Sequence, residues 1–138
     1  MGKIMGIDYG LKYLGIAITD TMHIIASPFG TIEGGLSLKK DALKILEIAE
    51  SNNVSTIVFG MPINMNGSKG KMAVIVHNLV DMIKSISNIK IVTIDERLTT
   101  VQAEKILISN NTSRNKRKNL KNKISAALIL QTYLNMFS

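Results

Sequence analysis

Residues 3–19 read "KIMGIDYGLKYLGIAIT", and the fold is predicted outward from this stretch. Two β-rich runs, 3–9 and 13–19, are separated by the short link "GLK". A glycine-containing link of this length predicts a β-hairpin, in which the two strands pair antiparallel. Asp8 stands at the end of the first run, two residues before Gly10. The hairpin therefore places a carboxylate where the chain turns, and glycine there lets the backbone approach a ligand closely.

The rest of the chain changes its hydrophobic period several times. Residues 22–32 have the pattern of a third strand broken by Pro28 and Gly30, which predicts a sheet edge or a bulge. The elements expected next are a helix over 37–51, a strand over 54–60, a helix over 71–86 and a strand over 89–95. Two more helices are expected over 99–109 and 120–136. The polar and basic stretch 110–119 is expected to be a mobile loop.

Strands that alternate with helices predict parallel pairing, and the hairpin-linked start adds an antiparallel part. We therefore predict an α/β fold with a mixed central sheet, antiparallel over its first three strands and then parallel, with flanking helices. The chain has 138 residues and shows no internal repeat or linker, so 1–138 is expected to form a single domain.

The charge favours a polyanionic partner. Lys and Arg total 17 against 10 Asp and Glu, which gives a net charge of +7 and favours RNA or DNA, or an anionic membrane surface. The absence of cysteine excludes disulfides and thiolate metal sites. No apolar stretch is long enough to span a bilayer and the chain does not open like a signal peptide, so a cytoplasmic protein with no membrane partner is expected.

Acidic residues stand at two strand ends. Asp8 ends the first predicted strand, and Asp95 and Glu96 end the last one. Ligands gather at the carboxyl ends of parallel strands, and neighbouring residues of a strand face opposite sides, so one of these two acids should face Asp8. Clustered carboxylates typically bind hard divalent cations, and paired cations clamp a phosphodiester for attack by water. The alternative is that these acids are simply solvated or cap helices.

Polar residues near these strand ends are candidates for phosphate binding. Lys12 follows Asp8 within reach of a phosphate, and Arg97 adds a bidentate donor beside the acids. The loop 61–70 follows another strand end, so its Asn64 and Lys69 should face the same crevice.

A basic run leads into the last predicted helix and comprises Arg114, Lys116, Arg117, Lys118 and Lys121. It is either a solvated loop or a track for phosphates, in which case binding should weaken steeply as salt rises. The chain has no Trp and only 4% aromatic residues, which argues against a base-stacking platform. Recognition of nucleic acid by shape and backbone fits better.

Four motifs span nearly the whole chain: "GIDYGLKYLGIAITD", "FGMPINMNGSKG", "TIDERLTTVQAEKIL" and "ISAALILQTYL". In this order they resemble the YqgF family, Holliday-junction-resolvase-like proteins that are also described as nucleases maturing pre-16S ribosomal RNA. The resemblance implies a ribonuclease H-like fold and phosphodiester hydrolysis that depends on Mg²⁺ or Mn²⁺.

The resemblance also implies roles for single residues. Asp8 corresponds to the family's first-strand acid, and Asp95, Glu96 and Arg97 correspond to its "DER" motif. The implied metal ligands are Asp8, Asp95 and Glu96. The loop between these motifs is matched by Gly60, Pro62 and Gly67.

The last motif departs from the family pattern. The family usually places an aspartate a few residues before the Ala-Ala pair of the final helix, and "LKNKISAAL" has Asn122 there. An amide oxygen still ligates a hard cation, but the site loses one negative charge and metal affinity should fall. Asn122 thus completes the candidate catalytic set with Asp8, Asp95 and Glu96.

Three functions follow from these observations. The first is a metal-dependent endonuclease that acts on structured RNA or branched DNA, with a ribosomal precursor particle or a two-fold junction bound by a homodimer as expected partners. The second is a non-catalytic or weakly catalytic nucleic-acid or ribosome-assembly binding protein, because of Asn122. The third, a sugar-kinase or actin-like ATPase, is disfavoured because such proteins need two such domains and this chain supplies one.

Overall fold

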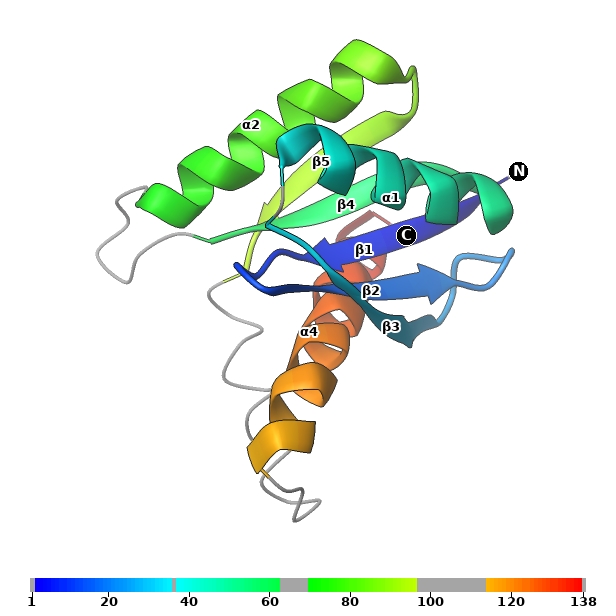
Figure 1. The fold of residues 1–138 in the computed structure, drawn as a ribbon. Helices are drawn as coiled ribbons and strands as arrows, with labels where there is room; N and C mark the ends of the chain where they lie inside the picture. The colour runs from blue at the N-terminus through cyan, green and yellow to red at the C-terminus, as the bar shows by residue number, and fades with distance from the viewer. Residues whose placement is uncertain (1, 36, 63–69, 97–113, 138) are drawn as a thin grey trace.

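The computed structural model describes residues 2–35, 37–62, 70–96 and 114–137, and its core is a five-stranded sheet in the order β3-β2-β1-β4-β5 (Figure 1). The strands are β1 (Lys3–Asp8), β2 (Tyr13–Thr19), β3 (Ala26–Glu33), β4 (Val54–Met61) and β5 (Lys90–Asp95). β1 pairs antiparallel with β2, and β2 pairs antiparallel with β3. β4 runs parallel to β1 and to β5. This confirms the mixed sheet predicted from the sequence.

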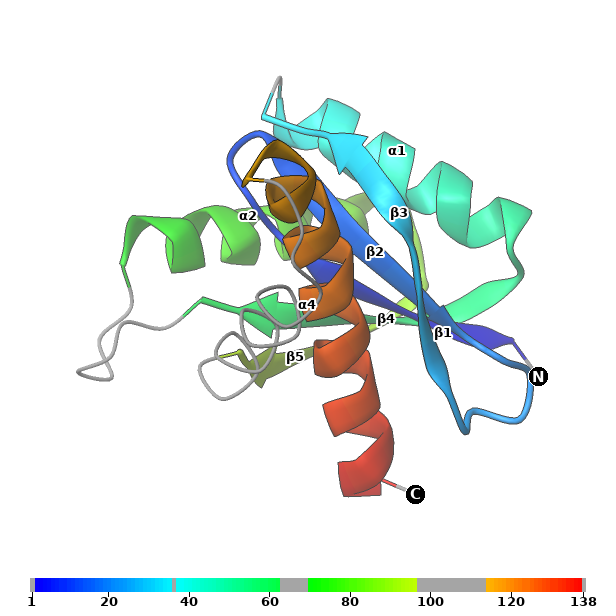
Figure 2. The ribbon, with the colours of Figure 1, turned by 90° about the horizontal axis from the view of Figure 1, so that it is seen from below.

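The helices divide between the two faces of the sheet. α1 (Leu38–Ser51) and α2 (Lys71–Ile86) cover one face, and α4 (Arg114–Phe137) crosses the other (Figures 1 and 2). Because side chains alternate along a strand, neighbouring residues feed two separate cores. Ile57 and Phe59 are buried under α1 and α2, whereas Val58 is buried under α4.

The start of α1 shows why this helix begins where it does. The Ser37 hydroxyl accepts the Lys40 backbone N–H at 3.1 Å, which satisfies one of the donors left unpaired at a helix start. Asp41, one turn into the helix, is buried, and its Oδ2 accepts the Gly35 N–H at 3.1 Å. These two side chains fix the turn that joins β3 to α1.

β3 is an edge strand with an irregular register, as Pro28 predicts. Its pairing with β2 shifts between Ile16 and Ala17, which lie opposite Gly30 and Pro28. A proline lacks the N–H needed inside a sheet, and the edge position with a register shift accommodates it. The predicted start at residue 22 is wrong, because the strand begins at Ala26 and the preceding residues form a turn.

α4 differs from its prediction in two ways. It begins at Arg114 rather than near residue 120, so the loop predicted over 114–119 is wrong. Arg and Lys are good helix formers and this stretch contains no proline, so charge alone does not end a helix. The fully buried side chains of α4 include Ala126, Ile129 and Leu130. The helix predicted over 99–109 lies outside the described residues.

Two glycines let α4 lie directly on the sheet. A Cβ added at Gly6 would lie 2.8 Å from the Ala126 carbonyl oxygen and 2.8 Å from the Leu130 Cβ. A Cβ at Gly15 would overlap the backbone of Asn122 and Lys123. Glycine inside a strand often marks such a close approach of another backbone. These two positions therefore set how near α4 comes to β1 and β2.

We expect Gly15→Ala to lower the free energy of unfolding by about 1–3 kcal/mol, the usual cost of overpacking. The new methyl group meets backbone atoms, which move only if the whole helix moves. Gly30→Ala is the matched control, because no heavy atom lies within 4 Å of a Cβ there, and its effect should stay within about 0.5 kcal/mol. Urea denaturation measures both, and equal losses would contradict this account of the docking.

Candidate active site

Asp8 stands at the carboxyl end of β1, half-buried, and is paired with Gly15 of β2. Gly6 faces α4, and side chains alternate along a strand, so Asp8 projects on the same face as Gly6. The Asp8 carboxylate therefore lies at the carboxyl end of the parallel strands, on the side of the sheet that α4 covers.

Glu96 reaches this face although its strand is not next to β1. β4 lies between β1 and β5, which separates their backbones by about 9–10 Å. By the register of β1 with β4, Gly60 is level with Asp8, and a Cβ added at Gly60 would lie 2.9 Å from the Glu96 Oε2. The Glu96 carboxylate thus lies over the gap that Gly60 leaves between the two strands.

Asp95 points to the other side of the sheet. It is paired with Met61 and follows Ile94, which packs in the core under α4. Alternation then turns Asp95 toward the α1 and α2 face and returns Glu96 to the α4 face. The Glu96 N–H donates to the Met61 carbonyl oxygen at 3.3 Å, so the ladder continues one residue past β5 and preserves this alternation.

α4 brings Asn122 to the same end of the sheet, and we call the place where Asp8, Glu96 and Asn122 lie the acid corner. The Asn122 backbone lies against Gly15, which is the partner of Asp8 across β1 and β2. Asn122 is half-buried at this position. Three residues that are far apart in the sequence, Asp8, Glu96 and Asn122, therefore lie at one end and on one face of the sheet. The sequence did not single out Gly15, although a glycine inside the run "YLGIAIT" was the available signal.

The donor atoms at this corner suit a hard divalent cation. Two carboxylates and an amide carbonyl offer oxygen ligands, and Mg²⁺ is commonly held by one or two carboxylates together with phosphate and water. Within the described ranges no three His, Cys, Asp or Glu side chains come together as a metal cluster. The residues therefore fit a cation that takes part of its coordination from a bound phosphate, with less protein charge than three acids would supply.

Lys12 lies beside this corner, in the turn after Asp8. Its side chain is exposed, and its Nζ lies 5.6 Å from the centroid of the Tyr13 ring. Gly10 and Pro62 lie at the same edge: a Cβ at Gly10 would be 2.5 Å from the Tyr13 carbonyl oxygen, and Pro62 directly follows β4. The positively charged Lys12 side chain is thus available to a phosphate that approaches Asp8.

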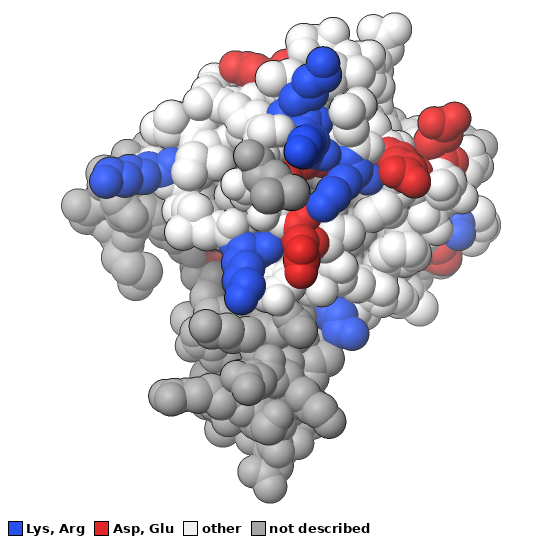
Figure 3. Space-filling model, in the orientation of Figure 1, with Lys and Arg blue, Asp and Glu red and all other residues white. Residues whose placement is uncertain are grey.

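Four residues of the predicted site lie outside the described residues: the candidate phosphate contacts Asn64, Lys69 and Arg97, and the loop residue Gly67. The other basic candidates belong to the first turns of α4, of which only the backbone course is described, and are Arg114, Lys116, Arg117, Lys118 and Lys121. On the face shown in Figure 3, lysines are interspersed with acidic side chains.

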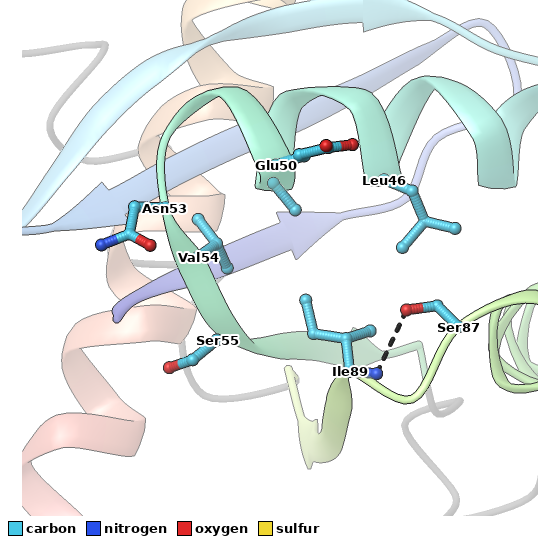
Figure 4. A pocket seen from close by; sticks show the side chains of 8 residues that line it. Leu46, Glu50, Asn53, Val54, Ser55, Ser87 and Ile89 are labelled. Atoms are coloured by element: carbon cyan, nitrogen blue, oxygen red, sulfur yellow. Dashed lines mark hydrogen bonds between the residues drawn. The ribbon is translucent and has the colours of Figure 1, made fainter. Parts of the chain in front are cut away.

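Several cavities among the described residues lie away from this corner, and two of them show why an anion would not bind there. One of about 590 Å³ opens at the amino ends of β4 and β5, and Glu50 is the only charged residue among the described residues that line it (Figure 4). A phosphate would be repelled there. Another, of about 330 Å³, is lined by Tyr9 and Asp41 on the α1 side. Burial, and secondly the Asp41 carboxylate, raise the pKa of the Tyr9 phenol, so that cavity also disfavours anions.

In the described part of the chain, no helix combines the length and the apolar character that crossing a membrane requires.

Comparisons with solved structures agree on the fold. The structure titled "T. thermophilus RuvC in complex with Holliday junction substrate" aligns with a TM-score of 0.57 at 14% identity and covers 99% of this chain and 97% of RuvC. The large terminase nuclease from thermophilic phage G20c aligns with a TM-score of 0.58 at 8% identity, over 95% of this chain and 81% of that chain. The ribonuclease H-like fold expected from the sequence is thereby confirmed.

Comparisons of sequence identify the family in addition to the fold. The family model described as RuvX, Holliday junction resolvase, matches residues 2–136. A protein of Endomicrobium trichonymphae named "Putative pre-16S rRNA nuclease" is 59% identical over 139 residues, which is 100% of this chain and 99% of that protein. One of the same name from Carboxydothermus hydrogenoformans is 42% identical over 133 residues, with 96% of each chain covered. The chain therefore belongs to the RuvX/YqgF family of Holliday-junction-resolvase-like nucleases.

Proposed function

We propose that this protein is an endonuclease that depends on Mg²⁺ or Mn²⁺ and hydrolyses phosphodiester bonds in the maturation of pre-16S rRNA. The observation that carries the proposal is the position of the Glu96 carboxylate over Gly60, on the face to which Asp8 projects. The names of the relatives supply the substrate class, since they match the full length of this chain.

In this proposal Asp8 and Glu96 hold the cation, and the Asn122 side chain contributes a neutral oxygen. When bound, the cation would supply Lewis-acid activation of the phosphodiester and of an attacking water. Asp95 is left out of the ligand set, because it faces the opposite side of the sheet. The proposed acidic ligands are therefore two, whereas the family resemblance implies Asp95 as a third.

The basic residues take the role of positioning the nucleic acid backbone. Lys12 binds a phosphate next to the scissile one, and Arg97 pairs with a phosphate bidentately. The basic first turns of α4 extend this contact away from the acid corner. Because these contacts release counterions, binding should weaken as salt rises, whereas sequence preference should be weak.

One observation favours a second function. Asn122 stands where the family pattern has an acid, so this chain brings two carboxylates to the corner and the described residues add no third. A protein with such a site would bind its nucleic acid in a ribosomal precursor particle and cleave it weakly or not at all. The two functions share the same nucleic-acid binding surface. They differ in whether the acid corner binds a divalent cation tightly enough for cleavage.

The first test compares the two neighbouring acids. A pre-16S rRNA fragment and a four-way DNA junction are incubated with Mg²⁺ or Mn²⁺, and initial cleavage rates are measured. We expect Asp8→Asn and Glu96→Gln to lower the rate by at least about 100-fold, because loss of a direct ligand costs more than loss of a residue that supports one. Asp95→Asn is the matched control and should keep the rate within about threefold, if it melts at the parent temperature. A loss in Asp95→Asn as large as that in Glu96→Gln would contradict the assignment.

The second test restores the missing charge. Asn122→Asp adds a carboxylate at the acid corner, so the Mg²⁺ concentration for half-maximal cleavage should fall by about tenfold, which corresponds to about 1.4 kcal/mol. Asn122→Ala, which removes the oxygen, should raise that concentration. If the parent cleaves under no metal condition and only Asn122→Asp cleaves, the binding function holds instead.

A further inference from the structure

The cavity of about 330 Å³ on the α1 and α2 face contains a buried carboxylate. It lies where the turn after β1, the start of α1 and the middle of α2 come together. Its volume is at the lower end of the range for small-molecule sites, about 300–1,000 Å³. The residues that line it include Tyr9, Leu11, Leu38, Asp41, Ile75 and Asn78. We call it the Asp41 cavity.

The carboxylate of Asp41 is only half satisfied. Asp41 is 2% exposed, and its Oδ2 accepts the Gly35 N–H at 3.1 Å, whereas its Oδ1 has no hydrogen-bond partner. Among the described residues, every other buried side-chain nitrogen or oxygen atom has a partner. Buried polar groups are nearly always hydrogen-bonded, so an exception calls for a missing partner such as a water or an ion.

The charge of this carboxylate is also not balanced by a neighbouring side chain. In the part of the chain that the structure describes, no Lys, Arg or His forms an ion pair with Asp41. Two lysines of adjoining segments are engaged elsewhere: Lys44 Nζ donates to the Glu33 carbonyl oxygen at 3.1 Å, and Lys12 Nζ lies 5.6 Å from the centroid of the Tyr13 ring. Because a buried charge is costly unless it is paired, a cation bound in the cavity would stabilise it.

The lining of the cavity suits an organic cation better than a metal ion. Hard divalent cations take several oxygen ligands, and no three His, Cys, Asp or Glu side chains gather within the described ranges. Leu11, Leu38 and Ile75 instead give the cavity apolar walls. An aliphatic stem gains free energy when such walls remove it from water. One carboxylate in an apolar-walled cavity therefore fits a cation at the end of an aliphatic stem.

The hydrogen bond that Oδ2 already makes selects the type of organic cation. A guanidinium pairs best with a carboxylate when it donates to both oxygens in parallel, but Oδ2 is engaged with the Gly35 N–H. A primary ammonium is a compact charge that donates to a single oxygen, and Oδ1 is that oxygen. Tyr9 and Asn78 bring two further oxygen acceptors to the lining.

We propose that the Asp41 cavity binds a primary alkylammonium, with Asp41 Oδ1 as the acceptor for its charged end and the apolar walls along its stem. Free aliphatic amines and lysine side chains of a protein partner both carry such a group. Tyr9 is buried under α1 and α2, and side chains alternate along a strand, so the preceding Asp8 projects to the other face. The amine therefore binds on the face of the sheet opposite the acid corner.

Amide NMR of the isotope-labelled full chain, without nucleic acid or divalent metal, tests this site. Butylammonium chloride is titrated to about 50 mM, because so small a ligand has few atoms with which to gain affinity. We expect a saturable shift of the Gly35 amide, which donates to the same carboxylate. Ammonium chloride lacks the stem and butanol lacks the charge, so each should bind at least about tenfold more weakly than butylammonium.

Asp41→Asn removes the charge and keeps an oxygen for the Gly35 N–H, so the dissociation constant of butylammonium should rise by at least about tenfold. Glu50→Gln is the matched control. It removes the same charge about 13 Å further along α1, beside the larger cavity, and should bind butylammonium like the parent. If Asp41→Asn does not fold, the comparison of butylammonium with ammonium and butanol on the parent decides the question.

Two further probes distinguish the sources of the ammonium group. Putrescine that binds more tightly than Nα-acetyl-lysine methylamide indicates a free amine, and the reverse order indicates a lysine side chain; either order supports the site. A parent whose Gly35 amide shows no saturable shift overturns the proposal, and so does a shift that ammonium chloride or butanol reproduces. A loss of binding in Glu50→Gln as large as that in Asp41→Asn overturns it as well. None of these results depends on cleavage, so the amine site and the nuclease function can fail separately.

Discussion

The close approach of α4 to the hairpin of β1 and β2 is the constraint on which the rest of the structure depends. The approach is possible because Gly6 and Gly15 carry no side chain, so the helix backbone rests on the strand backbone. A helix held by backbone contact cannot rotate or slide without a clash, whereas a helix held by flexible side chains can repack. The same contact that buries Ala126 and Leu130 therefore brings Asn122 to the corner where Asp8 stands.

A third glycine, Gly60, makes room in the same way between the parallel strands. Asp8 and Glu96 come from strands that are not neighbours, and the strand between them would normally place a side chain in the gap. Gly60 leaves that gap open, and the Glu96 carboxylate and the Ile129 side chain of α4 share the space above it. The acid corner is thus assembled by three absent side chains as much as by the acids themselves, which explains how so small a fold brings distant residues together.

Much of the fold could be predicted from the sequence. The hairpin, the mixed sheet and the ends of α2 follow from local patterns, and Pro28 correctly indicated an edge strand with irregular pairing. The start of α4 could not be predicted in this way, since a basic polar run is equally compatible with a loop or with an exposed helix. Which of Asp95 and Glu96 faces α4 could be decided only from the tertiary structure. Alternation along the strand predicts that the two side chains face opposite sides of the sheet, but not which side each one faces. The sequence did not indicate that Met22 and Phe137 line one cavity, because they come from a turn and from a distant helix end, which only the folded chain brings together.

The central claim is that Asp8 and Glu96, and not Asp95, hold a divalent cation on the α4 face. A crystal soaked in Mn²⁺ and measured at the manganese absorption edge tests it most directly, because the anomalous signal locates the ion without assumptions about the ligands. The account predicts an anomalous peak on the α4 face, bound by carboxylate oxygens of Asp8 and Glu96. A peak bound by Asp95 on the opposite face, or no peak at the acid corner at saturating Mn²⁺, would contradict it.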